Sequence, residues 1–255
     1  MRESKLVGLL FLLILMLAWE LAARLNLVNP LIVPPLSRIF ASFAALVSSG
    51  DIPLQILASL KRAAAGYALA AAVFVPLGIL MGLFDMWRRA LEVVVEMLRP
   101  IPPPVIIPVA LLFFGLEDEM KVFVIFFSCA WPILLNTLDG VRNIEKLLLD
   151  TARTFGLSYA RMIWKVVLPA CLPQIMTGLR ISLPITLILV VISEMVGSAD
   201  GIGYFILDAQ RRFRVAQMYA GMLALAILGY SLNLLFDGAH RVLLAWHWGM
   251  LHRKG

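Results

Sequence analysis

A carboxylate and three hydroxyl groups interrupt a long apolar stretch in the last third of the chain, residues 175–196. The carboxylate belongs to Glu194, and the hydroxyls belong to Ser182, Thr186 and Ser193. An ionisable side chain inside a membrane span is costly unless it faces water or a partner charge. We therefore predict that these four residues line or gate a polar pathway. The alternative is that Glu194 forms a structural pair or reaches the outer interface, while the hydroxyls pack between helices.

Other residue types that perform chemistry lack a functional arrangement. His240, His247 and His252 lie near the C-terminus without the spacing of metal ligands, and Cys129 and Cys171 are not placed to form a metal site or a disulfide. The chain contains no Gly-x-x-x-x-Gly-Lys-Ser/Thr motif, so it carries no phosphate-binding loop of that type. We expect no enzyme active site, no metal site and no cofactor in this chain, which disfavours a membrane enzyme.

The longest polar passage, residues 139–173, has the pattern of two short helices joined by a turn. Apolar residues recur at helical spacing before Gly156, which stands where a glycine with positive φ commonly ends a helix. Ser158 can cap a second helix, predicted for residues 159–167 and ended by Pro169. A simple connection between spans does not need this much structure, which indicates a docking surface. The alternative is an amphipathic loop on the membrane surface.

The composition places these features in a polytopic membrane protein. Of the 255 residues, 62% are hydrophobic and only 15% are charged, and the mean hydropathy is +0.92. A soluble domain of this length carries more charge. Apolar stretches of about 20 residues can cross the hydrocarbon core of a bilayer. The pattern predicts one all-α transmembrane domain over residues 1–255, with six spans near residues 6–25, 57–84, 105–116 with the preceding helix, 121–138, 175–196 and 215–236.

Proline and glycine mark places where these spans depart from a plain helix. The proline-rich segment 100–104 ends the helix that precedes the third span, and Pro132 predicts a kink in the fourth. Gly78 and Gly82 have the Gly-x-x-x-Gly spacing within a span rich in small residues, which predicts close packing against another helix. A short amphipathic helix is predicted near residues 37–46.

Basic residues predict the orientation of the spans. If residues 139–173 lie in the cytoplasm, thirteen of the 22 Lys and Arg residues fall in cytoplasmic segments and eight in outer segments. This bias agrees with the positive-inside rule and places both termini in the cytoplasm. Arg211, Arg212 and Arg214 oppose the bias, because they fall in an outer segment. Membrane topology therefore explains the net charge of +6, and nucleic acid is not expected as a partner.

The spacing within the polar passage resembles the cytoplasmic loop signature of permease subunits of bacterial ATP-binding-cassette (ABC) importers. That signature has Glu-Ala-Ala, Gly, Ile and Leu-Pro positions, matched here by Asp150, Thr151, Ala152, Gly156, Val166, Leu168 and Pro169. Asp, Thr and Val are departures from it. In that family the short helix of this loop fits a cleft of the ATPase subunit. The resemblance implies that these residues couple ATP hydrolysis to transport, and Thr151 alters the contact because it is β-branched and polar.

Further segments resemble the nitrate, sulfonate, taurine and bicarbonate branch of these permeases. They cover nearly the whole chain: Pro34–Ser37, Leu98–Pro102, Phe114–Leu116, Gly178–Arg180 and Gly201–Gly203. The resemblance implies a homodimer in the bacterial plasma membrane, a cytoplasmic ATPase dimer that uses the ATP, and a periplasmic or lipid-anchored binding protein. The solute would be a sulfonate, nitrate, bicarbonate or similar small molecule.

Two alternatives to this assignment stay open at this level. The same branch includes permeases for pyrimidine vitamin precursors and riboflavin-like substrates, and the residues do not separate these solutes. A secondary transporter would also have broken helices and charges within its spans. It is disfavoured because the sequence shows no inverted repeat and only Arg180 and Glu194 as charges deep in a span.

Overall fold

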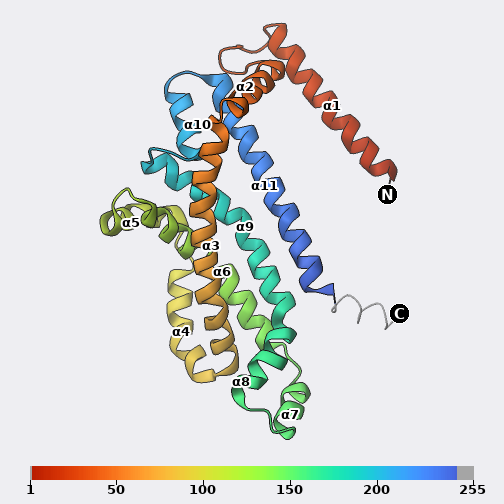
Figure 1. Ribbon diagram of the computed structural model, residues 1–255, viewed down its shortest axis with the longest axis vertical. Coiled ribbons are helices and arrows are strands. Elements are labelled where there is room, and N and C mark those ends of the chain that lie inside the picture. Colours follow the sequence, from red (N-terminus) through yellow and green to blue (C-terminus); the bar gives the residue numbers. More distant parts are fainter. Residues whose placement is uncertain (1, 246–255) are drawn as a thin grey trace. The chain divides into compact units, whose positions relative to one another are not determined.

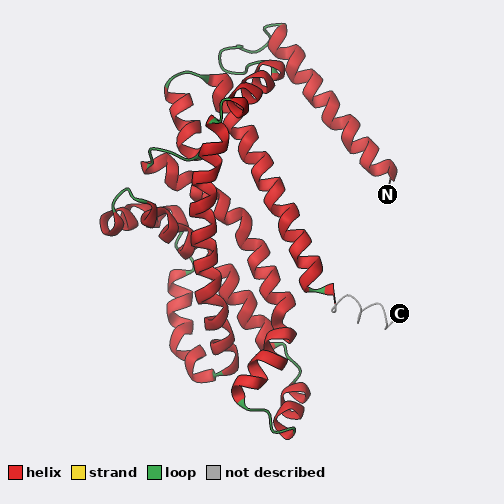
Figure 2. Ribbon diagram, in the orientation of Figure 1, coloured by secondary structure: helices red, strands yellow, loops and turns green. Residues whose placement is uncertain are grey.

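The computed structural model describes residues 2–245, and every regular element in that part of the chain is a helix (Figures 1 and 2). The predicted all-α fold class is confirmed. The helices form two compact units, which are described one at a time. The first comprises Met1–Ser59 with Ala199–Leu228, and the second comprises Leu60–Ser198 with Gly229–Gly255. Two long helices, α3 (Asp51–Leu83) and α11 (Val215–Leu243), contribute to both units.

The first unit contains α1 (Arg2–Arg24), α2 (Leu36–Ser48) and α10 (Ile202–Arg211), together with the start of α3 and the first half of α11. Polar contacts fix α2 to the end of α1. The carboxylate of Glu20 accepts hydrogen bonds from the backbone N–H of Ser37 at 3.1 Å and from its hydroxyl at 2.8 Å.

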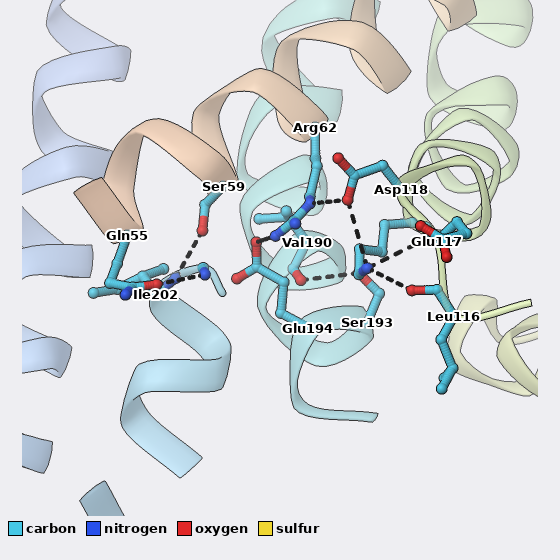
Figure 3. A network of polar contacts seen from close by, with 12 residues as sticks. Gln55, Ser59, Arg62, Leu116, Glu117, Asp118, Val190, Ser193, Glu194 and Ile202 are labelled. Atoms are coloured by element: carbon cyan, nitrogen blue, oxygen red, sulfur yellow. Dashed lines mark hydrogen bonds and ion pairs between the residues drawn. The ribbon is translucent and has the colours of Figure 1, made fainter. Parts of the chain in front are cut away.

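Side chains of α3 accept hydrogen bonds from the backbone N–H groups at the start of α10. The N–H of Gly201 donates to Gln55 Oε1 at 2.6 Å, and the N–H of Ile202 donates to Ser59 Oγ at 2.8 Å (Figure 3). The first amides of a helix have no partner within the helix, so these two contacts fix where α10 begins. Gly201 has a φ of 104°, a backbone conformation that favours glycine.

The second unit is built around α6 (Asp118–Arg142) and α9 (Leu168–Gly197), with the remainder of α3 packed beside them. It also contains α4 (Asp85–Leu98), α5 (Ile106–Phe114), α7 (Lys146–Thr154) and α8 (Tyr159–Met162). Val124, Ile125 and Ile133 of α6 are fully buried, as is Val190 of α9. The core of this unit is therefore the seam where α3 and α9 meet α6.

Glycine allows these helices to approach closely. A Cβ atom added at Gly78 of α3 would lie 2.7 Å from the Cβ of Thr137 in α6, and one at Gly82 would lie 2.6 Å from the Cβ of Val141. A Cβ at Gly178 of α9 would lie 2.8 Å from the carbonyl oxygen of Pro132. Real Cβ atoms do not come this close, so none of the three positions has room for a methyl group. The Gly-x-x-x-Gly pair of α3 packs within the chain, against α6.

Four helices in the described part of the chain are long and apolar enough to cross a membrane: α3, α6, α8 continued through α9, and α11. They contain the predicted spans 57–84, 121–138, 175–196 and 215–236, apart from Phe84, which follows α3. The third predicted span, residues 105–116 with the preceding helix, is a pair of helices bent by 84° between α4 and the segment Pro103–Phe114. With that pair counted the number is five, and the total of six stays a prediction.

The predicted end of the second loop helix at Pro169 is wrong. The helix from Tyr159 runs on to Gly197, through a π-helical segment, η2 (Ile163–Val167). The N–H of Leu168 donates to the carbonyl of Ile163, five residues back instead of four. A proline has no N–H and its ring clashes with the carbonyl four residues earlier, so a helix normally ends or kinks there. The wider π turn directly before Pro169 accommodates the ring and lets the helix continue.

Candidate functional site

The turn after α7 has the geometry that the sequence predicts. Gly156 has a φ of 71°. Its N–H donates to the carbonyl of Arg153 at 2.9 Å, and the N–H of Leu157 donates to the carbonyl of Ala152 at 3.2 Å. These two bonds form a Schellman motif, which closes the last turn of α7 and reverses the chain. A Cβ at Gly156 would meet no atom within 4 Å, so backbone conformation alone favours glycine here.

One face of α7 is anchored in the core. Ala152 is only 5% exposed and belongs to a buried cluster that includes Ile79 of α3, Val141 of α6 and Cys171 of α9. The small side chain of alanine lets the backbone of α7 approach this cluster. Helix α7 is therefore packed directly against helices that are long enough to cross the membrane.

The opposite face of α7 and the turn that follows are exposed. Leu147 is 75% exposed and Phe155 is 81% exposed, although both are large and apolar. Asp150 on the same helix pairs with Arg153 at 3.0 Å, and both remain open to solvent. Apolar side chains mixed with charges on an exposed surface are typical of a site that another protein covers.

Thr151 and Ala152 have different environments although they are adjacent. Thr151 is exposed, and its hydroxyl donates to the carbonyl of Leu147 at 2.7 Å. Thr151, which departs from the loop signature, therefore lies on the accessible surface. The alanine that close packing requires is Ala152, which is buried. Leu168, which packs beside the same buried cluster, and Pro169 form the first turn of α9, which follows η2 directly.

The hydroxyl residues predicted for the pathway are enclosed between α9 and α6. Ser182 and Thr186 are buried, and their hydroxyls donate to the carbonyls of Gly178 and Ser182, at 2.8 and 3.0 Å. The Oγ of Ser193, also buried, donates to the carbonyl of Val190 at 2.9 Å. Each hydroxyl is thus satisfied by the backbone of its own helix, an arrangement that suits close packing. Their role in a pathway stays a prediction.

Glu194 belongs to a network of charges that links three helices (Figure 3). Its side chain is fully buried and accepts a hydrogen bond at 3.0 Å from Arg62 Nη1 of α3. Arg62 Nε donates to Asp118 Oδ1 of α6 at 2.7 Å, and Lys121 Nζ lies 3.6 Å from the same oxygen. Lys121 Nζ also donates to the carbonyl of Leu116 at 2.9 Å. The charge at Glu194 is therefore matched inside the protein.

Arg62 and Lys121 are site residues that sequence reasoning placed in outer segments. Arg62 is 6% exposed and Lys121 is 2% exposed, so both are buried parts of α3 and α6. A possible signal was the position of Arg62, which lies eleven residues inside the helix that begins at Asp51. A charge there needs a partner, but the sequence did not identify Glu194 as that partner. Within residues 2–245 no cluster of His, Cys, Asp or Glu could hold a metal ion.

Comparison with known proteins gives a consistent result. The family model for binding-protein-dependent transport system inner membrane components matches residues 74–246. The putative aliphatic sulfonates transport permease protein SsuC of Bacillus subtilis is 31% identical over 96% of this chain and 89% of its own length. The taurine transport system permease protein TauC of Escherichia coli is 29% identical over 92% and 87%. The nitrate import permease protein NrtB of Leptolyngbya laminosa is 37% identical over 71% and 65%.

Solved structures support the fold. An inward-facing conformation of the MetNI methionine ABC transporter has a chain that matches 72% of this chain and 92% of its own length, with a TM-score of 0.61 and 20% sequence identity. At this level of identity the likeness concerns the arrangement of helices.

Proposed function

The chain belongs to the family of inner membrane components of binding-protein-dependent transport systems, and from this premise we propose how it works. It is the permease subunit of an ABC importer. We propose that two copies form the translocation pathway, that a separate ATPase dimer docks on α7 in the cytoplasm, and that a binding protein delivers the solute from the other side. In this arrangement both termini are cytoplasmic and the chain lies in the plasma membrane of a bacterium.

The observation that carries this proposal is the two-sided construction of α7. One side is fixed through Ala152 to the cluster formed by α3, α6 and α9, whereas Leu147 on the other side and Phe155 in the turn that follows are exposed. A docked ATPase that moves α7 therefore moves the helices of the membrane domain with it. An amphipathic loop lying on lipid would not need to be fixed to the core in this way.

We propose that the buried charges stabilise the arrangement of α3, α6 and α9 at the outer end of α9. Glu194 lies three residues from the end of that helix, and its charge is matched by Arg62. In this proposal Glu194 acts at the outer end of the pathway, where a change in the network accompanies opening. Ser182, Thr186 and Ser193 hold α9 close to α6. The surface of α9 that does not contact α6 then lines the pathway.

The solute we propose is either a small molecule that carries a sulfonate group or the nitrate ion. The support comes from the relatives, whose names specify aliphatic sulfonates, taurine and nitrate. The experiment uses liposomes that contain this chain with its ATPase and binding protein. We expect ATP-dependent uptake of labelled taurine, an alkanesulfonate or nitrate, with no uptake when the binding protein is left out. Uptake that persists without ATP and responds to an ion gradient would indicate a secondary transporter instead.

A further inference from the structure

The corner between α10 and α11 has a feature that the proposed function does not use. Phe213 is 88% exposed, and its backbone is left-handed, with a φ of 57°. Its N–H donates to the carbonyl of Gln210 at 3.0 Å, and the N–H of Arg214 donates to the carbonyl of Ala209 at 2.8 Å. This is the same helix-ending motif as at Gly156, in a position that normally holds glycine.

Phenylalanine is unfavourable at this position for two independent reasons. A bulky side chain is rarely found in the left-handed region, because its Cβ crowds the backbone. An aromatic ring exposed to water also forgoes the free energy of burial. Glycine would remove both penalties and keep the two hydrogen bonds. Strained residues with exposed side chains concentrate at functional sites, so Phe213 points to a contact outside the chain.

Basic residues surround the exposed ring. Arg211 and Arg214 are exposed, while Arg212 pairs with Asp208 at 2.9 Å. Beside Phe213 lies a hollow of about 530 Å³, which Arg38 of α2 and Arg214 border. Its other lining residues are uncharged: Ala41, Ser42, Val215, Ala216 and Gln217. An aromatic projection next to a concave surface with a basic rim has the composition of a protein-binding hot spot.

The proposed topology assigns this corner to the outer side of the membrane. Helix α9 begins at the loop that carries α7 and is 30 residues long, about 45 Å, so the chain that follows it emerges on the other side. If α7 is cytoplasmic, Arg211, Arg212 and Arg214 are outside, where the positive-inside rule disfavours them. A partner that binds outside the cell membrane explains both the arginines and the exposed ring.

We propose that Arg38, Arg211, Phe213 and Arg214 form a docking surface for the solute-binding protein, which presents carboxylates to the arginines and an apolar pocket to Phe213. The inference rests on the proposed function, in which such a protein delivers the solute. A second copy of this chain does not fit, because two basic surfaces of the same kind repel each other. A lipid surface fits less well, because it has no fixed relief to match the ring and the adjacent hollow.

The test measures the affinity of the purified binding protein for the complete transporter in nanodiscs of phosphatidylcholine. Phe213→Gly removes the ring and relieves the backbone, so the variant folds at least as well as the unaltered chain. We expect its affinity to fall about tenfold or more, the size of a hot-spot effect. Arg211→Gln with Arg214→Gln lowers the affinity and also weakens its dependence on salt between about 0.05 and 0.3 M. Lys61→Gln, which removes an exposed positive charge elsewhere, is the matched control and leaves the affinity unchanged.

The other outcomes overturn the proposal. Unchanged affinity of Phe213→Gly, with normal binding to the unaltered transporter, removes this docking surface and leaves the proposed function standing. Unchanged affinity together with a loss of thermal stability that appears only in nanodiscs containing about one quarter phosphatidylglycerol identifies a lipid contact instead. If the unaltered transporter neither binds the protein nor responds to it with faster ATP hydrolysis, the proposed function itself fails.

Discussion

Arg62 and Glu194 form a buried ion pair between α3 and α9, with 3.0 Å between Nη1 and Oε1, although 132 residues separate them in sequence. Arg62 also reaches Asp118 of α6, so one guanidinium group connects all three helices of the core. The pair gives a physical reason why a carboxylate is tolerated near the end of a membrane helix. Its charge is neutralised inside the protein before any solute arrives.

Removing one member of this pair is expected to be more harmful than removing both. Glu194→Ala removes the buried carboxylate that pairs with Arg62, which keeps its pair with the exposed Asp118, and should lower the free energy of unfolding by up to about 3–5 kcal/mol. The double substitution Arg62→Met with Glu194→Met fills the space with apolar groups and should recover most of that loss. Thermal unfolding of the purified permease in detergent measures both. A double variant no more stable than Glu194→Ala would show that the pair is not the source of the effect.

The contribution of Glu194 to transport is measured separately with Glu194→Gln, which keeps the shape of the side chain and removes the charge. We expect slower uptake in liposomes with little change in insertion. Unchanged uptake over a range of solute concentrations would assign Glu194 a purely structural role.

Gly78 should not accept even one added methyl group. Its Cβ would lie 2.7 Å from the Cβ of Thr137, so Gly78→Ala forces α3 away from α6 and should cost about 1–3 kcal/mol of stability. Gly238→Ala is the control, because no atom lies within 4 Å of a Cβ there and alanine favours the helix. Equal melting temperatures for the two variants would contradict the close packing of α3 on α6.

Substitutions at two adjacent residues of α7, one exposed and one buried, should differ strongly in their effect. Thr151→Ala removes an exposed hydroxyl and is expected to change stability by less than about 0.5 kcal/mol. Ala152→Leu forces a large side chain into the buried cluster, displaces α7 and should reduce the amount of ATPase that co-purifies. If both variants retained the ATPase equally, α7 would not depend on this anchor.

The sequence predicted features that local chemistry determines. The turn at Gly156 follows from one glycine at the end of an apolar helical pattern, and it has the expected positive φ. The apolar spans were predicted because stretches of about 20 apolar residues are long enough to cross a bilayer. The continuation of α8 into α9 could not be anticipated in this way, because Pro169 is a strong signal for a helix end and the π turn that absorbs it has no local sequence signature.

Most of the features that the sequence did not predict depend on contacts between residues far apart in the chain. Arg62 and Lys121 were assigned to outer segments because single charges near the end of a span usually lie at the interface. Their burial depends on where Glu194, Asp118 and the carbonyl of Leu116 meet in the fold. The close contact of Gly178 with α6 is likewise a tertiary property, although a glycine within an apolar span was visible in the sequence.

The topology can be tested by labelling single introduced cysteines in intact cells. A cysteine at Asp200, which follows α9, should react with a membrane-impermeant thiol reagent from outside, and one at Ser158, which precedes α8, should not. The native cysteines Cys129 and Cys171 are buried and should contribute little background. The reverse labelling pattern would show that the orientation of the chain in the membrane is inverted and that α7 is not cytoplasmic.

The most direct test of α7 as the coupling element compares Gly156→Val with Gly50→Val. Both glycines have positive φ, 71° and 85°, and neither has an atom within 4 Å of an added Cβ, so valine imposes a similar strain of about 1–3 kcal/mol at each. Only Gly156 ends the helix that we propose the ATPase contacts. The measurement is ATP hydrolysis by the complete transporter in liposomes, with and without the loaded binding protein. We predict that Gly50→Val keeps the stimulation, whereas Gly156→Val inserts normally but either loses the ATPase or hydrolyses ATP without responding. Full assembly and full stimulation in Gly156→Val would contradict the role of α7.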